Sequence, residues 1–302
     1  MGFGEAHMAN YILSTTSTSD LSEKHYLDRN IKYLCFHFSM DGKDYTDDLG
    51  KSIPFHEFYQ KMQEGALTKT SQISVGEYVD YFTPFMEEGN DVLHVTLSSG
   101  LSGDYNSACT AAHMLMEKYP ERKIYVVDSL GASSGYGLLM DKLGDLRDEG
   151  YSLTDLRAWA EEHKLEVHHW FFSTDLQYYV RGGRISKTSG FLGNLLHICP
   201  LLNMDEAGHL IPREKIRTIK KVERAIVDKM ITYAQDGKNY TGKVYISESD
   251  CMDYATAVAT MVEEAFPHMK GKVEINSIGT TIGSHTGPGT VALFFFGNKR
   301  TN

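Results

Sequence analysis

Two periods of apolar residues alternate along this chain. Nearly continuous apolar runs at 91–97 and 123–128 predict strands that are buried on both faces. Each run is followed by a segment in which apolar residues recur every three to four positions, as in 103–119, and this period predicts an amphipathic helix. Strands that alternate with helices in this way predict an α/β protein with a parallel sheet and helices on both of its faces.

The same pattern divides the chain into two domains, 1–165 and 166–302. Within the first domain, residues 33–70 carry a hairpin signal at Asp41-Gly42 and are interpreted as a small insertion. The run at 290–296 is too apolar for an exposed edge, so we expect it at the centre of the second sheet. The other elements expected in the second domain are strands at 167–172, 243–248 and 273–277, a hairpin at 201–211, and helices at 174–180, 218–235 and 252–266.

Composition and charge narrow the class of protein. With 302 residues, of which 41% are hydrophobic and 23% charged, the chain is long enough to bury a sizeable core. A formal net charge of −10 argues against broad binding to nucleic acids or anionic membranes, because both require a basic face. No apolar stretch approaches the ~20 residues of a membrane helix, and 1–10 lacks the features of a signal peptide. Since the four cysteines are scattered, we expect reduced thiols and a cytoplasmic protein without stable membrane insertion.

Hydroxyl and glycine residues gather in four loops, at 14–20, 70–74, 98–103 and 283–289. The first and third follow predicted strands, where open α/β sheets bind ligands, and the second precedes a helix N-terminus, which favours an anion. Together they predict a neutral cup of donors for a carboxylate or a phosphate. Each cluster alone has a simpler explanation, because Ser and Thr before a helix are commonly caps and glycine runs are commonly turns.

Two further features have both a functional and a structural interpretation. His285 lies among glycines and hydroxyls, in a turn that can expose it to a ligand, whereas the histidine spacing elsewhere predicts no metal site and no cofactor. Arg181 and Arg184 flank two glycines and offer guanidinium groups to a carboxylate or a phosphate. The alternative is a helix C-terminus, capped by Gly182, with the arginines complementing the helix dipole.

Taken in order, these segments resemble the DegV family, whose members include the FakB subunits of bacterial fatty acid kinase. The R-G-G-R-I-S and I-G-x-H-T-G-P-G motifs are intact, and the T-S-Q-P-S motif differs only at Ile73. The opening T-D-S-T-x-D-L motif has Thr16 in place of Asp. The matching segments, which span almost the whole chain, are 15–21, 70–74, 98–108, 127–129, 181–186 and 282–289.

This resemblance implies a fold and a ligand. The fold would be an N-terminal three-layer α/β/α domain with a parallel sheet and a C-terminal two-layer α/β domain with a mixed sheet. A single long-chain fatty acid would lie in a tunnel between the two domains. The residues that the resemblance assigns to the fatty-acid carboxylate are Thr70, Ser71, Ser98 or Ser99, and His285.

The resemblance also implies a lipid carrier rather than an enzyme. A separate fatty acid kinase subunit would phosphorylate the bound acyl group with ATP, and the carrier itself would hold no cofactor. Arg181 and Arg184 are expected to serve this partner or the phosphate, since a local basic feature on an acidic protein suits electrostatic docking.

Two other functions stay open from the residues alone. A hydrolase would use Ser99 or Ser102 with His285, but the sequence designates no third group to orient the histidine and no oxyanion hole. A binding module for a phosphorylated sugar or nucleotide would use the same hydroxyl clusters. Turnover of an ester substrate tests the first alternative, and the mass of a co-purified ligand tests the second.

Overall fold

The computed structural model of the chain describes residues 11–186 and 198–301, so the prediction for 1–10 lies outside the described residues. The first half contains the strands β1 (Tyr11–Thr16), β2 (Ile31–Leu34), β6 (Asp91–Thr96) and β7 (Ile124–Asp128). Its helices are α1 (Glu23–Asp28), α3 (Val75–Glu87), α4 (Asp104–Lys118), α5 (Ser134–Asp148) and α6 (Leu153–His163), with the 3-10 turns η1 (Ser17–Ser19) and η2 (Lys164–Glu166).

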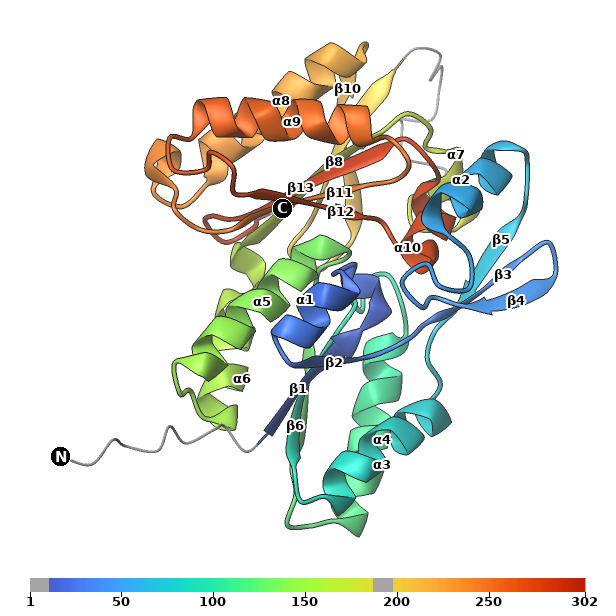
Figure 1. Ribbon diagram of the computed structural model, residues 1–302, viewed down its shortest axis with the longest axis vertical. Helices are drawn as coiled ribbons and strands as arrows, with labels where there is room; N and C mark the ends of the chain where they lie inside the picture. Colours follow the sequence, from blue (N-terminus) through green and yellow to red (C-terminus); the bar gives the residue numbers. More distant parts are fainter. Residues whose placement is uncertain (1–10, 187–197, 302) are drawn as a thin grey trace.

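The four strands form a parallel sheet in the order β2-β1-β6-β7 (Figure 1). Helices α3 and α4 cover one face, α6 contacts the other, and α5 lies beside α6 and also reaches the second sheet. The predicted start of α3 is confirmed, since Ser74 and Glu77 form a reciprocal capping box there. The parallel sheet with helices on both faces agrees with the expectation from the apolar pattern.

The second half builds a six-stranded mixed sheet in the order β10-β9-β8-β13-β11-β12, in which only the β11–β12 pair is parallel. Helices α8 and α9 cover one face of this sheet, and the other face packs against α5 (Figure 1). Strand β13 lies between β8 and β11, which confirms its predicted central position. The bounds are β8 (Val167–Ser173), α7 (Gln177–Arg181), β9 (Cys199–Met204), β10 (Leu210–Ile216), α8 (Ile219–Tyr233), η3 (Gly237–Asn239), β11 (Val244–Glu248), α9 (Met252–Ala265), β12 (Val273–Ser277), α10 (Thr280–Thr286) and β13 (Thr290–Phe296).

The insertion forms a third, three-stranded sheet in the order β4-β3-β5, covered by one helix. Its elements are β3 (His37–Met40), β4 (Lys43–Thr46), α2 (Phe55–Gln63) and β5 (Thr68–Ser71). The predicted Asp41-Gly42 turn joins β3 to β4, with φ of 50° and 81° as such a hairpin requires. The alternating stretch expected at 33–40 is divided, because β2 ends at Leu34 and joins the parallel sheet while β3 joins the insertion.

Helix α10 replaces the glycine-rich turn that the sequence predicts around His285. Within this segment, Ile278, Thr281, Ile282 and His285 follow a helical period and face one cavity. The helix contacts α7, α2, β3 and β5, so it lies where the insertion meets the second half of the chain. The domain boundary predicted at 165/166 falls within η2 and stays a prediction.

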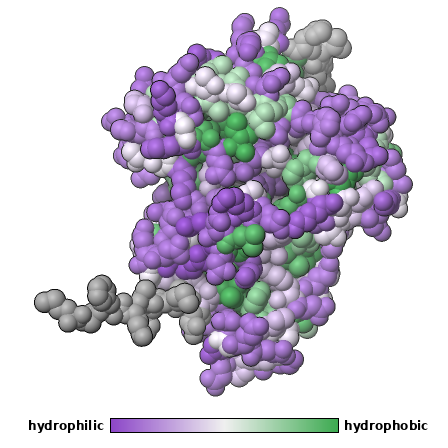
Figure 2. Space-filling view, in the orientation of Figure 1, coloured by the Kyte–Doolittle hydropathy of each residue, from purple (hydrophilic) through white to green (hydrophobic). Residues whose placement is uncertain are grey.

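The viewed surface of the protein is mostly hydrophilic. In Figure 2, hydrophobic residues show only in separate small areas between hydrophilic ones. Among the described residues, no helix is long and apolar enough to cross a membrane.

Candidate functional site

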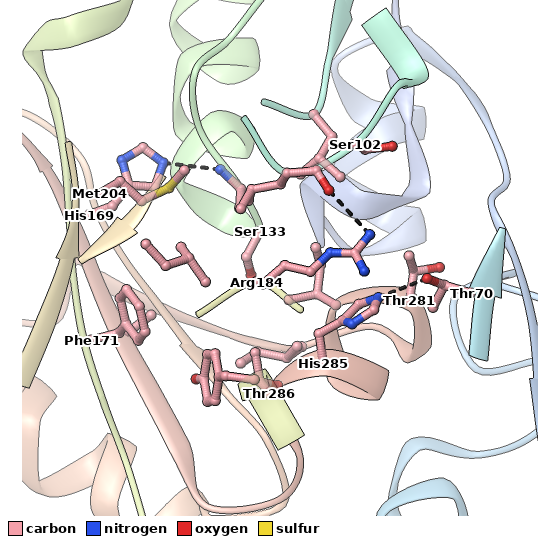
Figure 3. A pocket seen from close by; sticks show the side chains of 18 of the residues that line it. Thr70, Ser102, Ser133, His169, Phe171, Arg184, Met204, Thr281, His285 and Thr286 are labelled. Carbon is pink, nitrogen blue, oxygen red and sulfur yellow. Dashed lines mark hydrogen bonds between the residues drawn. The ribbon is translucent and has the colours of Figure 1, made fainter. Parts of the chain in front are cut away.

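A cavity of about 440 Å³ lies where the loops after β6 and β7 meet the second sheet and α10. Both halves of the chain and the insertion contribute to its wall, which is mainly apolar. In Figure 3, His169, Phe171 and Met204 lie on the side away from Thr70 and His285. The apolar lining residues are Phe36, Leu97, Leu101, Ala132, Phe171, Met204, Leu210, Ile278, Ile282, Ala292 and Phe294.

One end of the cavity holds a hydrogen-bonded pair of side chains. Thr70 Oγ1 on β5 and His285 Nε2 on α10 lie 2.7 Å apart, as Figure 3 shows. Burial lowers the pKa of His285 to about 4, and the positive charge of Arg184 acts in the same direction, so the ring is neutral at pH 7. His285 Nδ1 is buried and has no hydrogen-bond partner among the described residues. Whichever tautomer is present, this pair therefore has one donor hydrogen to offer a ligand.

The glycine pair after α7 allows a close approach to His285. A Cβ atom on Gly182 would lie 2.2 Å from His285 Nδ1, so only glycine fits beside the ring. The R-G-G-R segment thus forms one wall of the histidine site. Its two arginines have different positions.

Arg184 lines the cavity, and Arg181 lies on the surface. The Arg184 guanidinium donates to the carbonyls of Gly182 (2.5 Å) and Leu101 (3.2 Å), and no carboxylate pairs with it in the described part of the chain. Burial lowers the pKa of Arg184, but an arginine keeps its charge at neutral pH. Arg181 is exposed, with its guanidinium 5.6 Å from the centre of the Tyr178 ring. The cavity therefore holds a half-buried cation without an acidic partner.

The serines of the predicted donor cup lie at different depths. Ser98 is fully buried, and its hydroxyl donates to the carbonyl of Gly208 (2.9 Å) outside the cavity lining. Ser99 and Ser71 are exposed and do not line the cavity. Ser102, the third serine of the S-S-G-L-S-G segment, lines the cavity together with Gly103. The structure thus brings Thr70, His285, Arg184 and Ser102 together, and places the other three serines elsewhere.

The sequence carries one further serine signal, apart from Ser99 and Ser102. Gly131-Ala132-Ser133-Ser134-Gly135 follows a strand, opens a helix and places Ser133 on the cavity wall, with φ of 54° and ψ of −153°. This resembles the strained serine turn of hydrolases. However, Ser133 Oγ lies 2.5 Å from the carboxyl of Asp20 and 2.9 Å from Ser247 Oγ, and no histidine ring bonds it among the described residues.

Neither the hydrolase alternative nor a metal centre gains support from this geometry. Within the described residues, no histidine nitrogen bonds a serine hydroxyl of the cavity, and His285, which bonds the Thr70 hydroxyl, has no third group at Nδ1 to orient it as a base. His169, the other histidine on the wall, lies 3.0 Å from the Val167 carbonyl and accepts from the Ala132 N–H (3.3 Å). Across the described residues, no group of His, Cys, Asp or Glu side chains is arranged to bind a metal ion.

Comparisons with known proteins agree on one family. The family described as "Uncharacterised protein, DegV family" matches residues 13–298. A DegV domain-containing protein of Clostridium perfringens is 34% identical over 293 residues, which cover 97% of this chain and 99% of that protein. A solved structure from Thermus thermophilus, titled as fatty acid binding of a DegV family protein, is 28% identical with a TM-score of 0.84 over 95% of this chain and 99% of that one. A stearic-acid-binding protein from Eubacterium ventriosum is 26% identical, with a TM-score of 0.84 over 96% and 99% of the two chains.

Proposed function

The chain belongs to the DegV family, and from that premise we propose that it binds a single long-chain fatty acid in the 440 Å³ cavity. One observation carries the proposal: an apolar cavity ends in a neutral Thr70–His285 pair and in Arg184, a cation without an acidic partner among the described residues. A fatty acid has the matching structure, with one anionic end and a long apolar remainder. A sugar phosphate or a nucleotide would leave the apolar wall unmatched.

The acyl chain supplies most of the binding free energy in this proposal. Burying about 15 methylenes contributes roughly 12 kcal/mol before the costs of ordering and association. The chain would extend from the Thr70–His285 end toward Phe171 and Met204, where the wall is apolar.

The carboxylate binds at what we term the head-group site, formed by Thr70, Ser102, Arg184 and His285. While the ring is neutral, the Thr70–His285 pair supplies one donor hydrogen, and Arg184 supplies the compensating charge. A bound carboxylate would raise the pKa of His285 from its value of about 4, because the negative charge favours the protonated ring. The protonated ring would then donate a charge-assisted hydrogen bond to the carboxylate, beside the ion pair that the carboxylate forms with Arg184.

The proposal extends to presentation of the carboxylate to a separate fatty acid kinase subunit, for which the family resemblance is the ground. Thr70 borders both the cavity and an open groove on the outer face of the insertion sheet, so the head group lies near the surface. Arg181 is exposed and available to the partner or to a phosphate. Arg181→Ala is then expected to reduce kinase-dependent acyl phosphorylation with fatty-acid binding kept, whereas Arg184→Ala reduces both.

Native mass spectrometry of the purified protein tests the ligand assignment. The expected result is an added mass equal to one free fatty acid, lost on delipidation and restored on reloading. Thr70→Ala and Ser71→Ala form a matched pair on β5, since Thr70 faces the cavity and Ser71 is exposed. We expect Thr70→Ala to weaken reloading and Ser71→Ala to leave it unchanged. A protein that never takes up a fatty acid, or one that hydrolyses an ester substrate, would contradict the proposal.

A further inference from the structure

Two carboxyl groups that the proposed binding site does not use meet at the start of α10. Asp20 follows η1, and Asp47 follows β4 in the insertion. Their side chains are 4% and 1% exposed, although neither forms an ion pair among the described residues. A Cβ atom on Gly279 would lie 2.7 Å from Asp20 Oδ1 and 3.2 Å from Asp47 Oδ1. The two groups therefore converge on a single point of the backbone.

Asp47 accepts four hydrogen bonds, two at each carboxylate oxygen. Oδ1 accepts from the backbone N–H (3.2 Å) and the hydroxyl (2.9 Å) of Thr280, and Oδ2 accepts from the Thr281 N–H (3.3 Å) and the Ser17 hydroxyl (3.2 Å). Ser17 Oγ also accepts from the Phe36 N–H (3.1 Å), which leaves its hydrogen for Asp47. Burial raises the pKa of Asp47, but the N–H groups that reach both of its oxygens oppose this shift, so the bonding pattern favours the ionised form.

Asp20 has the opposite bonding pattern. Oδ1 accepts from the Gly279 N–H (3.0 Å), but Oδ2 faces only the Ser133 hydroxyl at 2.5 Å. Ser133 can direct its own hydrogen to Ser247 Oγ, 2.9 Å away, and accept one from a protonated Asp20. Burial raises the pKa of Asp20 well above its usual range, and the charge of Asp47 raises it further. Of the two carboxyl groups, Asp20 is therefore the one whose surroundings favour a proton.

These bonds fix the beginning of the helix that carries His285. The N–H groups of Gly279, Thr280 and Thr281 all end on the two carboxyl groups, and without them the short helix would start with unsatisfied donors. Just before the helix begins, Tyr59 in the insertion donates to the Ile278 carbonyl (2.7 Å). His285 comes five residues after Thr280, on the same helix, and reaches Thr70 of the insertion.

We propose that Asp47 is a positioning residue of the head-group site: its carboxylate fixes the start of α10, and α10 in turn places the His285 ring against Thr70. Asp20 serves as the neutral neighbour that allows a single charge to be buried there. The inference rests on the proposed function only in assigning His285 to a fatty-acid carboxylate.

Two conservative substitutions separate this role from simple packing. In Asp20→Asn, the new amide can donate to Ser133 Oγ while its oxygen still accepts from Gly279, so it copies the protonated carboxyl. In Asp47→Asn, the new N–H₂ group must face an existing N–H donor. We expect Asp47→Asn to lower fatty-acid loading at least tenfold and Asp20→Asn to change it less than twofold. Asp44→Asn, at an exposed position of the same insertion, is the control.

The decisive readout is the ¹H–¹⁵N imidazole spectrum of His285 in delipidated protein, which needs no ligand. Asp47→Asn is expected to shift the His285 signals and to abolish the spectral signature of the hydrogen bond between the His285 ring and Thr70. The Asp20→Asn spectrum is expected to match that of the wild type. Should Asp47→Asn fail to fold, Thr280→Val removes one of the four bonds and is expected to move the same signals by less. Unchanged His285 signals in a folded Asp47→Asn or Thr280→Val protein would overturn the inference, as would equal effects of Asp20→Asn and Asp47→Asn. If instead His285→Ala loads fatty acid normally, the proposed function fails and the positioning role does not.

Discussion

Two of the regions where the two halves of the chain meet differ in how their polar groups are satisfied. Away from the cavity, Asp141 on α5 forms what we term the ion cluster, with His25 (3.1 Å), Arg29 (3.2 Å), Lys243, and the hydroxyl of Tyr245 (3.1 Å). Both oxygens of this carboxylate have partners, since Oδ1 faces His25 and Arg29 and Oδ2 faces Lys243 and Tyr245. At the head-group site, by contrast, His285 Nδ1 has no partner and Arg184 has no acid beside it among the described residues.

The difference separates structural polar groups from groups that await a ligand. The ion cluster joins the two halves of the chain, and its charges are paired with one another, so no unpaired charge is left for a ligand. An incomplete site is costly when empty, because buried donors without partners destabilise the fold, and it becomes complete when a suitable ligand arrives. The variants below test this contrast, beginning with the largest expected effect.

Removing the central acid of the ion cluster should have the largest effect on stability. Asp141→Ala leaves His25, Arg29 and Lys243 without their shared partner, and we expect the free energy of unfolding to fall by about 3 kcal/mol. Urea denaturation measures this change. Fatty-acid loading of the folded fraction should stay normal, since Asp141 does not line the cavity. If Asp141→Ala kept its stability but loaded fatty acid poorly, the comparison between a structural ion cluster and a ligand-binding head-group site would be wrong.

Removing the ring at the head-group site should affect the ligand and not the fold. His285→Ala is expected to weaken fatty-acid binding by about 2 kcal/mol, or roughly thirtyfold, because one donor to the buried carboxylate is lost. Isothermal titration with a delipidated protein gives the affinity, and thermal unfolding of the empty protein should show no loss. His113→Ala, at an exposed position, is the control. Equal affinities for wild type and His285→Ala would mean that the head group binds elsewhere.

A methyl group beside the ring should have a smaller effect of the same kind. Gly182→Ala places a Cβ atom 2.2 Å from His285 Nδ1, so the ring must move away from its present position. We expect binding to weaken by about 1.4 kcal/mol, or tenfold. Gly183→Ala is not a matched control, because φ at Gly183 is 74° and the substitution would add backbone strain. Gln177→Ala, at an exposed position on α7, serves instead, and a similar loss there would argue against a specific contact with His285.

A further prediction concerns pH and the ion cluster. Burial alone would lower the pKa of His25, but the hydrogen bonds that its ring donates to the Asp141 and Glu274 carboxylates raise it to about 9. A group whose pKa is raised on folding stabilises the protein fully below its unfolded pKa of 6.5 and loses that contribution as the pH rises through about 9. The difference in free energy of unfolding between wild type and His25→Asn should therefore shrink from about pH 6 to about pH 10. A constant difference over this interval would show that His25 acts through packing alone.

The sequence predicts the sheets well and the head-group site only in part. The buried strands β6, β7 and β13 can be predicted from the sequence because each is a continuous run of apolar residues. Helix α10 cannot be predicted in this way, because the acids that complete its first turn are 259 and 233 positions away in the chain. The motif match names Thr70 and His285, which lie in contact although they are 215 positions apart. Their role toward a fatty acid stays a prediction.

Loop geometry decides which serine faces the cavity, and this geometry cannot be predicted from the pattern of residue types. Ser98, Ser99 and Ser102 are chemically alike, and only the path of the backbone turns Ser98 toward Gly208, Ser99 toward solvent and Ser102 toward the cavity. The same holds for the two arginines around Gly182, one of which is exposed while the other is half-buried. Identical residue types within one motif therefore have separate tasks.

The wall of the cavity comes from both halves of the chain, and this has a thermodynamic consequence. A molecule bound there completes a hydrophobic core that the empty protein leaves unfilled, so folding and loading are linked equilibria. At a free ligand concentration 100 times the dissociation constant, such linkage adds about 2.7 kcal/mol to the free energy of unfolding. Local openings that admit a protease would then be rarer in the loaded form than in the empty one. When the ligand is scarce, proteolysis would remove the empty molecules first, and the amount of protein that remains would then depend on the ligand concentration.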